Sequence, residues 1–209
     1  MVTELVTLDE GKFLVRLARN AVSDYIRSGV EISPPEDTPL SLHPKSGVFV
    51  TIEEYDGGRK TLRGCIGYPL PYAPLVEATI DSAISAATRD PRFEPMVEAE
   101  LSRVVFEVSV LTPPSLVKVD RPMDYPKRIK VARDGLVVEM GFHKGLLLPQ
   151  VPVEWGWDEA TFLSECCMKA GLPPDSWLSK DVKVYSFTAQ VFSEVSPSGE
   201  IENRNMDQP

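Results

Sequence analysis

The sequence predicts an α+β fold, with an antiparallel β-sheet flanked by helices in one globular body. Three observations lead to this class. Segments with helical and with strand periodicity are interleaved along the chain. Turn signals such as Asp56-Gly57-Gly58 join consecutive strands directly, and strands joined by a short turn pair antiparallel. The 209 residues, 43% of them hydrophobic, suffice for a sizeable core without a disulfide or a structural metal.

The N-terminal half is expected to contain two helices with one hairpin between them. Residues Thr7 to Glu10 fit the S/T-x-x-E capping box, apolar residues follow at the helical spacing, and Gly29 is a suitable stop. The hairpin combines the β-rich residues 47–53 with a return strand at 60–66. The second helix covers residues 74–88, with a proline in its first turn.

The C-terminal half is expected to be richer in strands. Residues 103–111 alternate in polarity and form a strand, and residues 129–140 form a hairpin about an Arg-Asp-Gly turn. A helix with an Asp cap covers residues 158–170, where a following glycine stops it. Residues 182–192 form a last strand that is partly apolar on both faces, which predicts a central position in a sheet. From there on the chain turns polar, and residues 196–209 are expected to be a frayed tail.

Charge and cysteine content bear on the class of protein. The formal net charge is −9, and an acidic surface repels phosphate groups, which disfavours binding to nucleic acids and membranes. The three cysteines, Cys65, Cys166 and Cys167, argue against a disulfide framework and for a reducing compartment. Cys166 and Cys167 have the apolar helical spacing of core residues. No apolar run reaches the ~18 residues of a membrane span, so we expect a cytoplasmic protein.

Several familiar site motifs are missing from the sequence. There is no glycine-rich loop ending in Lys-Ser/Thr for a phosphate, and no G-x-S-x-G elbow for a serine nucleophile. The two histidines, His43 and His143, lie far apart in sequence, and no Cys/His group has the spacing of a zinc site. We therefore expect neither a metal nor a cofactor.

The segment Leu62-Arg63-Gly64-Cys65-Ile66-Gly67 is the strongest candidate for a functional centre. Gly64 and Gly67 allow a positive φ or the close approach of another backbone, and we assign both to substrate binding. In a regular strand Arg63 and Cys65 share a face, where a guanidinium would bind an anion and lower the pKa of the thiol. One hypothesis makes Cys65 a nucleophile. The alternative makes it a small packing residue, which is the commoner role of cysteine.

The loop from Asp90 to Pro95 is the second candidate. Its prolines stiffen it, and a stiff loop can hold the guanidinium of Arg92 for bidentate binding of a carboxylate or phosphate. Asp90 would line the same substrate site. The alternative is an internal Arg92–Asp90 clamp that ties the end of the preceding helix to the loop.

Two further residues complete the candidate site. Glu107 is a charge within an apolar strand, so it is either buried as a general acid or base or displayed on an exposed sheet face. His143 lies in a predicted turn, where it is either the base for Cys65 or merely solvated. The proposed catalytic group is thus Cys65, Glu107 and His143.

At the six-residue segment the sequence resembles the AMMECR family. The other matching segments occur in the same order as in the family, and together they extend from about Leu5 to Val195. The matching segments are Leu62–Gly67, Asp90–Phe93, Glu107–Leu111, Leu148–Val151 and Gly156-Trp157. The resemblance implies a soluble, mixed α/β domain over residues 5–195 with two unequal lobes. It supplies no established activity, but it implies Memo-type and radical-SAM proteins as pathway or physical partners.

Three functional hypotheses follow. The first is an enzyme whose pocket at Arg63-Gly64-Cys65 acts on a small anionic substrate, and we favour it because strands that merely pack seldom need arginine and cysteine between glycines. The second is an adaptor or binding module for a Memo-type or radical-SAM partner. The third, nucleotide or RNA handling, is disfavoured by the acidic charge and by the lack of a basic, aromatic stripe.

Overall fold

The computed structural model describes residues 5–204, which divide into two compact units. The first unit comprises residues 5–111 and 190–204, and the second comprises residues 112–189. Both contain antiparallel strand pairs and helices, which confirms the predicted α+β class. Within the described residues, four short 3₁₀ helices lie at Leu40–Leu42, Glu98–Glu100, Pro122–Lys127 and Ser176–Leu178.

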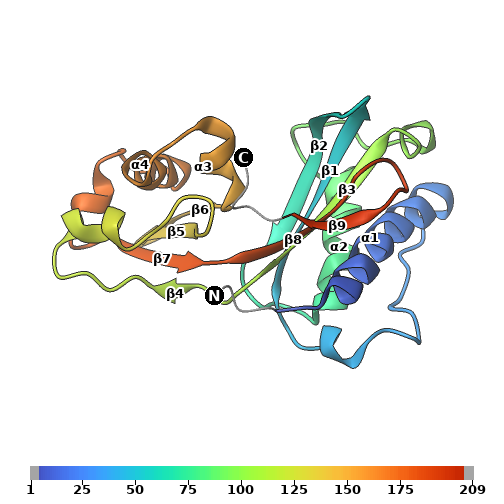
Figure 1. Cartoon of the computed structure of the whole chain (residues 1–209), viewed down its shortest axis with the longest axis horizontal. Helices are drawn as coiled ribbons and strands as arrows, with labels where there is room; N and C mark the ends of the chain where they lie inside the picture. The colour runs from blue at the N-terminus through green and yellow to red at the C-terminus, as the bar shows by residue number, and fades with distance from the viewer. Residues whose placement is uncertain (1–4, 205–209) are drawn as a thin grey trace. The chain divides into compact units, whose positions relative to one another are not determined.

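The first unit is a five-stranded sheet with two helices packed on one face (Figure 1). The strand order is β2-β1-β3-β8-β9, and β1 pairs antiparallel with both β2 and β3. The helices are α1 (Leu8–Ser28) and α2 (Leu75–Thr88). The strands are β1 (Gly47–Asp56), β2 (Arg59–Tyr68), β3 (Val104–Leu111), β8 (Ala189–Glu194) and β9 (Ile201–Arg204).

Local sequence explains why α1 forms where it does. The Thr7 hydroxyl accepts the Glu10 backbone N–H while the Glu10 carboxylate accepts the Thr7 N–H, which is the predicted capping box. Gly29 ends the helix with φ of 71°. In β1, Val50 and Ile52 belong to the core that the helices cover, so the residues between them face the other side of the sheet.

A buried ion pair ties α1 to the sheet. The Arg19 guanidinium donates to the Glu194 carboxylate, with Nε at 2.6 Å, and to the carbonyls of Leu101 and Val104 at 3.0 and 2.7 Å. Glu194 also accepts the Phe106 N–H at 2.9 Å. These hydrogen bonds satisfy the charged groups of Arg19 and Glu194, so the ion pair can lie inside the core.

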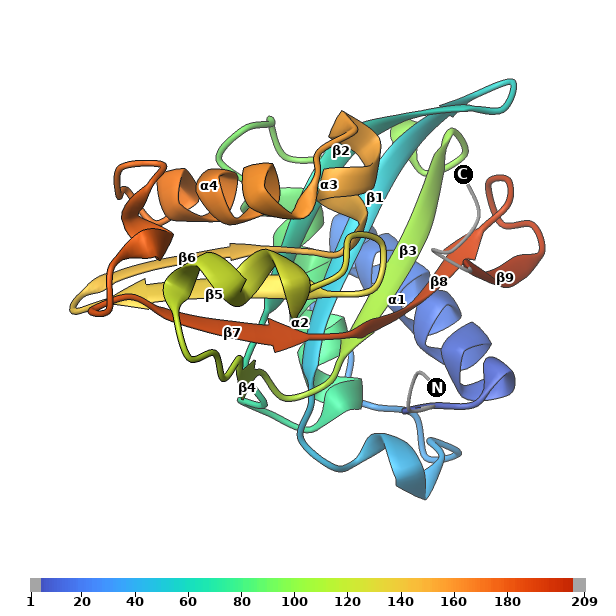
Figure 2. The ribbon, with the colours of Figure 1, turned by 60° about the vertical axis from the view of Figure 1, so that its left-hand side comes forward.

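The second unit is a four-stranded sheet in the order β4-β7-β5-β6, with α4 packed against β5 and β6 (Figure 2). Cys166 and Cys167 are fully buried in its core, as the sequence predicted. The strands are β4 (Ser115–Leu116), β5 (Gly135–Met140), β6 (His143–Leu147) and β7 (Lys183–Phe187). The helices are α3 (Gln150–Trp155) and α4 (Glu159–Lys169), the latter capped by Asp158 as predicted.

The predicted hairpin at residues 129–140 was wrong. Residues 129–134 form a turn that precedes β5, because the Asp134 carboxylate accepts the Lys130 N–H at 2.8 Å and Ala132 takes a φ of 68°. The hairpin in this region joins β5 to β6 instead, with Met140 opposite His143.

Two predictions for the C-terminal region also fail. Residues 182–192 are not one strand: β7 and β8 belong to different sheets, and between them Thr188 donates its N–H to the Thr112 hydroxyl at 2.8 Å. Within the predicted tail, residues 201–204 form β9. A tight turn allows this, since Val195 donates to the Glu200 carbonyl at 2.8 Å. Residues 205–209 of the predicted tail lie outside the described part.

Candidate functional site

The six-residue segment lies in β2, the strand at one edge of the five-stranded sheet. Gly64 faces the helices, and a Cβ there would lie 2.1 Å from the Ala86 carbonyl oxygen. A Cβ on Gly67 would lie 2.2 Å from the Val48 carbonyl oxygen and 2.5 Å from the Phe49 ring. These close approaches account for both glycines by packing alone.

A β-bulge separates Arg63 from the face that carries Cys65. Gly64 pairs with Ile52 and Leu62 pairs with Glu53, so Arg63 is an extra residue with no partner position in β1. Its guanidinium instead donates to the Glu100 carboxylate from Nε at 2.7 Å and from Nη2 at 3.2 Å. The prediction that Arg63 lowers the pKa of the thiol was therefore wrong, because the bulge breaks the i, i+2 relation on which it rested.

Asp90 and Arg92 hold the backbone of Cys65 from the outer edge of the sheet. The Asp90 carboxylate accepts the Cys65 N–H at 2.9 Å, and Arg92 Nη2 lies 3.4 Å from the Cys65 carbonyl oxygen. The same guanidinium forks onto Asp90 at 2.9 and 2.7 Å. This pairing holds the pKa of Asp90 at about 2 and raises that of Arg92. The two side chains thus act on Cys65 as a neighbouring strand would.

The thiol is part of a polar row that crosses three adjacent strands. Cys65 lies opposite Thr51 of β1, and Thr51 lies opposite Glu107 of β3. The Thr51 hydroxyl donates to the Cys65 sulfur at 3.3 Å. Since Val50 and Ile52 point into the helix-covered core, the row lies on the opposite face. The sheet therefore places a thiol, a hydroxyl and a carboxylate side by side.

The carboxylate of this row is buried and paired. The Glu107 residue is 4% exposed, and its Oε2 accepts a hydrogen bond from Arg204 Nη1 of β9 at 2.6 Å. The cation lowers the cost of burying the charge. β9 thus contributes a residue to the row from a segment that the sequence predicted to be frayed.

The surroundings of the thiol raise its pKa. Burial is the largest cause, and the negative charges of Glu107 and Asp90 act in the same direction. The hydrogen bond from Thr51 and the charge of Arg92 lower the pKa but do not outweigh burial. The thiol is consequently neutral at physiological pH, and a reaction there must include removal of its proton.

Two guanidiniums keep unused donors near the motif. Arg63 and Arg92 lie 5.7 and 5.6 Å from the centroid of the Phe93 ring. Arg63 donates from Nε and Nη2 to the Glu100 carboxylate, and Arg92 donates from the same two atoms to the Asp90 carboxylate. Arg63 Nη1 is buried and has no hydrogen-bond partner among the described residues. The Nη1 group of Arg92, whose side chain is 53% exposed, is the donor that an anion can reach from solvent.

The structure brings most of the predicted site residues together, but His143 belongs to the other unit. It lies in β6, where its Nδ1 is 3.2 Å from the Ala170 carbonyl oxygen. Sequence reasoning missed Thr51, Glu100 and Arg204. Only Thr51 left a signal, as a polar residue in the alternating pattern of β1, because the other two are brought in by chain folding. Across residues 5–204 no group of three metal-ligating side chains converges, and no helix is long and apolar enough to span a membrane.

Comparison with known proteins places these features in a family. The AMMECR1 family model matches residues 15–192. Protein PH0010 of Pyrococcus horikoshii is 58% identical over 195 residues, which cover 93% of this chain and 94% of that protein. A protein of Thermococcus onnurineus is 57% identical over 195 residues, covering 93% and 95% of the two chains. The crystal structure of uncharacterized PH0010 superposes with a TM-score of 0.93 at 55% identity, covering 96% of this chain and 99% of that chain.

Proposed function

The chain belongs to the AMMECR1 family, and from that premise we propose that it is an enzyme in which the Cys65 thiol attacks a small anionic substrate. One observation carries the proposal. The thiol is half-buried, accepts a hydrogen bond from Thr51, and shares a sheet face with the buried carboxylate of Glu107. A residue that only fills space needs neither of these neighbours.

The remaining residues have roles that follow from their contacts. Asp90 and Arg92 fix the backbone of Cys65, and the unused Nη1 group of Arg92, whose side chain is 53% exposed, binds the substrate anion with Arg63 behind it. Because Thr51 lies between Cys65 and Glu107, the thiol proton reaches Glu107 through the Thr51 hydroxyl, which turns to accept from sulfur and donate to the carboxylate. The new bond joins sulfur to the carbonyl carbon of an ester or thioester, and the carbonyl π electrons move to its oxygen. When the carbonyl reforms, the bond to the alcohol or thiol group breaks, and that group leaves with the proton that Glu107 had accepted, so that an acyl group remains on Cys65.

A raised thiol pKa sets the conditions of such a reaction. Because the resting thiol is neutral, it is protected from oxidation and indiscriminate alkylation. Attack then depends on proton transfer at the moment when the substrate is bound. The rate should rise with pH until the thiol ionises by itself.

The test is a search for a covalent adduct on Cys65. The full chain is incubated with a panel of small carboxylate-bearing esters and thioesters, and adducts are mapped by peptide mass spectrometry. An adduct on Cys65 that is absent in Glu107→Gln and Cys65→Ser supports the proposal. The buried Cys166 and Cys167 serve as internal references. If Cys65 reacts only when all three cysteines do, in denaturant, the thiol is a packing group and the proposal fails.

A second candidate function is that of an adaptor for a Memo-type or radical-SAM partner. The observation that favours it is the segment directly after the motif, where Leu70 and Tyr72 are 49% and 72% exposed. The Tyr72 ring is stacked on Tyr68, with ring centroids 5.5 Å apart, which holds it in place. Loss of partner binding in Tyr72→Ser with retained binding in Cys65→Ser would support the adaptor, and binding that survives Tyr72→Ser would count against it.

A further inference from the structure

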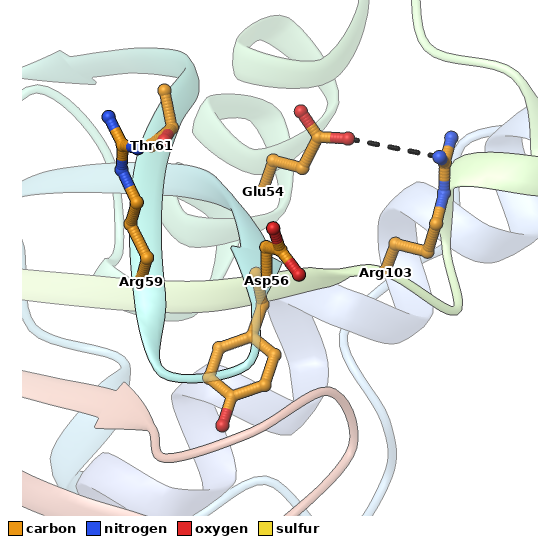
Figure 3. Close-up of a pocket in the computed structure, with 6 residues that line it drawn as sticks. Glu54, Asp56, Arg59, Thr61 and Arg103 are labelled. Carbon is orange, nitrogen blue, oxygen red and sulfur yellow. Dashed lines mark ion pairs between the residues drawn. The ribbon is translucent and has the colours of Figure 1, made fainter.

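A pocket of about 380 Å³ lies at the turn end of the β1–β2 hairpin of the first unit, and Cys65 is not among its lining residues (Figure 3). Glu54 and Asp56 come from β1, and Thr61 and Arg59 lie directly opposite them in β2. Arg103, which precedes β3, closes one side (Figure 3). The lining residues are Glu54, Tyr55, Asp56, Arg59, Thr61 and Arg103.

The charges in this pocket are balanced but poorly paired. Glu54 and Arg103 form a long ion pair of 3.9 Å. Asp56 and Arg59 face each other across the hairpin, yet neither side chain has a hydrogen bond or an ion pair with any residue from 5 to 204. Directly opposed unlike charges on a hairpin ordinarily attract each other. Figure 3 shows the Arg59 guanidinium beside Thr61 instead, away from the Asp56 carboxylate.

This arrangement creates two subsites of opposite charge. Arg59 and the Thr61 hydroxyl form a donor subsite that suits a carboxylate. Glu54 and Asp56, two positions apart on one strand face, form an acceptor subsite that suits an ammonium group. Directly opposite and diagonal positions on a hairpin are about 5–8 Å apart, so a short molecule can reach both subsites.

We propose that the pocket binds a small zwitterion of the α-amino acid class, with its carboxylate on Arg59 and Thr61 and its ammonium on Glu54 and Asp56. A simple anion would meet two carboxylates in the same pocket, and a simple cation would meet two guanidiniums. Only a dipolar ligand satisfies both subsites at once. The site is separate from the reaction proposed for Cys65 and does not depend on it.

The test is an NMR titration of the uniformly ¹⁵N-labelled full chain with glycine and β-alanine, and with acetate and methylammonium as single-charge probes. We expect saturable shifts of hairpin amides, centred on residues 54–61, with the two zwitterions and weaker or no shifts with the single-charge probes. Because each ion pair is solvent-exposed, affinity should be in the millimolar range and should fall as salt rises.

Matched variants locate the site. Arg59→Gln should weaken glycine binding about tenfold, whereas Arg16→Gln, the same change at an exposed position of α1, should leave it unchanged. Cys65→Ser should also bind glycine normally, which separates this site from the proposed enzyme. The proposal is overturned if acetate shifts the hairpin as strongly as glycine, if no probe shifts it, or if Arg59→Gln binds like the parent chain.

Discussion

The first unit contains two buried glutamates, each paired with an arginine, and the two ion pairs differ in how far solvent reaches them. On the helix-covered face, Arg19 and Glu194 are 12% and 2% exposed, and backbone groups satisfy their remaining hydrogen-bonding atoms. On the opposite face, Arg204 is 42% exposed while Glu107 is 4% exposed, and a thiol and a hydroxyl adjoin the carboxylate. A closed network of this kind stabilises a fold, whereas a half-open one beside a thiol is suited to chemistry.

The largest expected effect on stability comes from removing the arginine of the buried Arg19–Glu194 pair. Arg19→Met should lower the free energy of unfolding by about 3–5 kcal/mol, because Glu194 stays buried without its cation. Arg204→Met should cost less, about 1–2 kcal/mol, since solvent already reaches that end of the pair. Urea unfolding of both variants measures this contrast. Equal losses of unfolding free energy would show that the two ion pairs contribute equally to stability.

The next effect concerns the packing of the motif. Gly64→Ala should lower the free energy of unfolding by about 1–3 kcal/mol, because the new methyl group meets the Ala86 carbonyl and the backbone must shift. The neighbouring Leu62→Ala, at a position that is 40% exposed, should change stability by less than about 0.5 kcal/mol. Thermal unfolding distinguishes them. A stable Gly64→Ala protein would mean that the glycine serves a ligand rather than the fold.

Acid should weaken the hydrogen bond by which the Asp90 carboxylate holds the Cys65 backbone. The pKa of Asp90 is about 2 in the folded chain, below its ordinary value of 3.8, so its contribution is present above pH 4 and is lost as the pH falls towards 2. Asp90→Asn should therefore be less stable than the parent chain by about 1–2 kcal/mol at pH 7. The gap between the two should shrink between pH 4 and pH 2.

The control for this pH dependence is Asp24→Asn, an exposed position on α1. Its stability should run parallel to that of the parent chain across the same range. A constant gap between Asp90→Asn and the parent would show that Asp90 acts by its shape alone. The carboxylate charge would then have no part in fixing the thiol.

Elements that depend on local sequence patterns were predicted correctly, whereas contacts between distant segments were not. The capping box at Thr7, the hairpin and the helix after it are local patterns, and the structure confirms them. The break between β7 and β8 leaves no local signal, because apolar residues continue through 182–192 and the chain changes sheets at Thr188, whose N–H donates to the Thr112 hydroxyl. Local signals therefore located the elements but not their partners.

The candidate site follows the same rule. Cys65 and Asp90 stood out by composition and turn chemistry, and their meeting follows from the short connection between β2 and α2. Arg204 binds Glu107 although the two residues are 97 positions apart, and no pattern in the sequence predicts this contact. The bulge at Arg63 likewise depends on the register of β1 and β2, so the face of its guanidinium was mispredicted.

The smallest effect is also the one closest to the proposed chemistry. Glu107→Gln removes a negative charge that raises the pKa of Cys65, so the pH midpoint for iodoacetamide alkylation of Cys65 should move down by less than about one unit. Glu98→Gln, at an exposed glutamate, should leave the midpoint where it is. An unchanged midpoint in Glu107→Gln would separate the carboxylate from the thiol electrostatically. The half-open pair would then be a structural feature like the Arg19–Glu194 pair, and Glu107 could not serve as the proton acceptor.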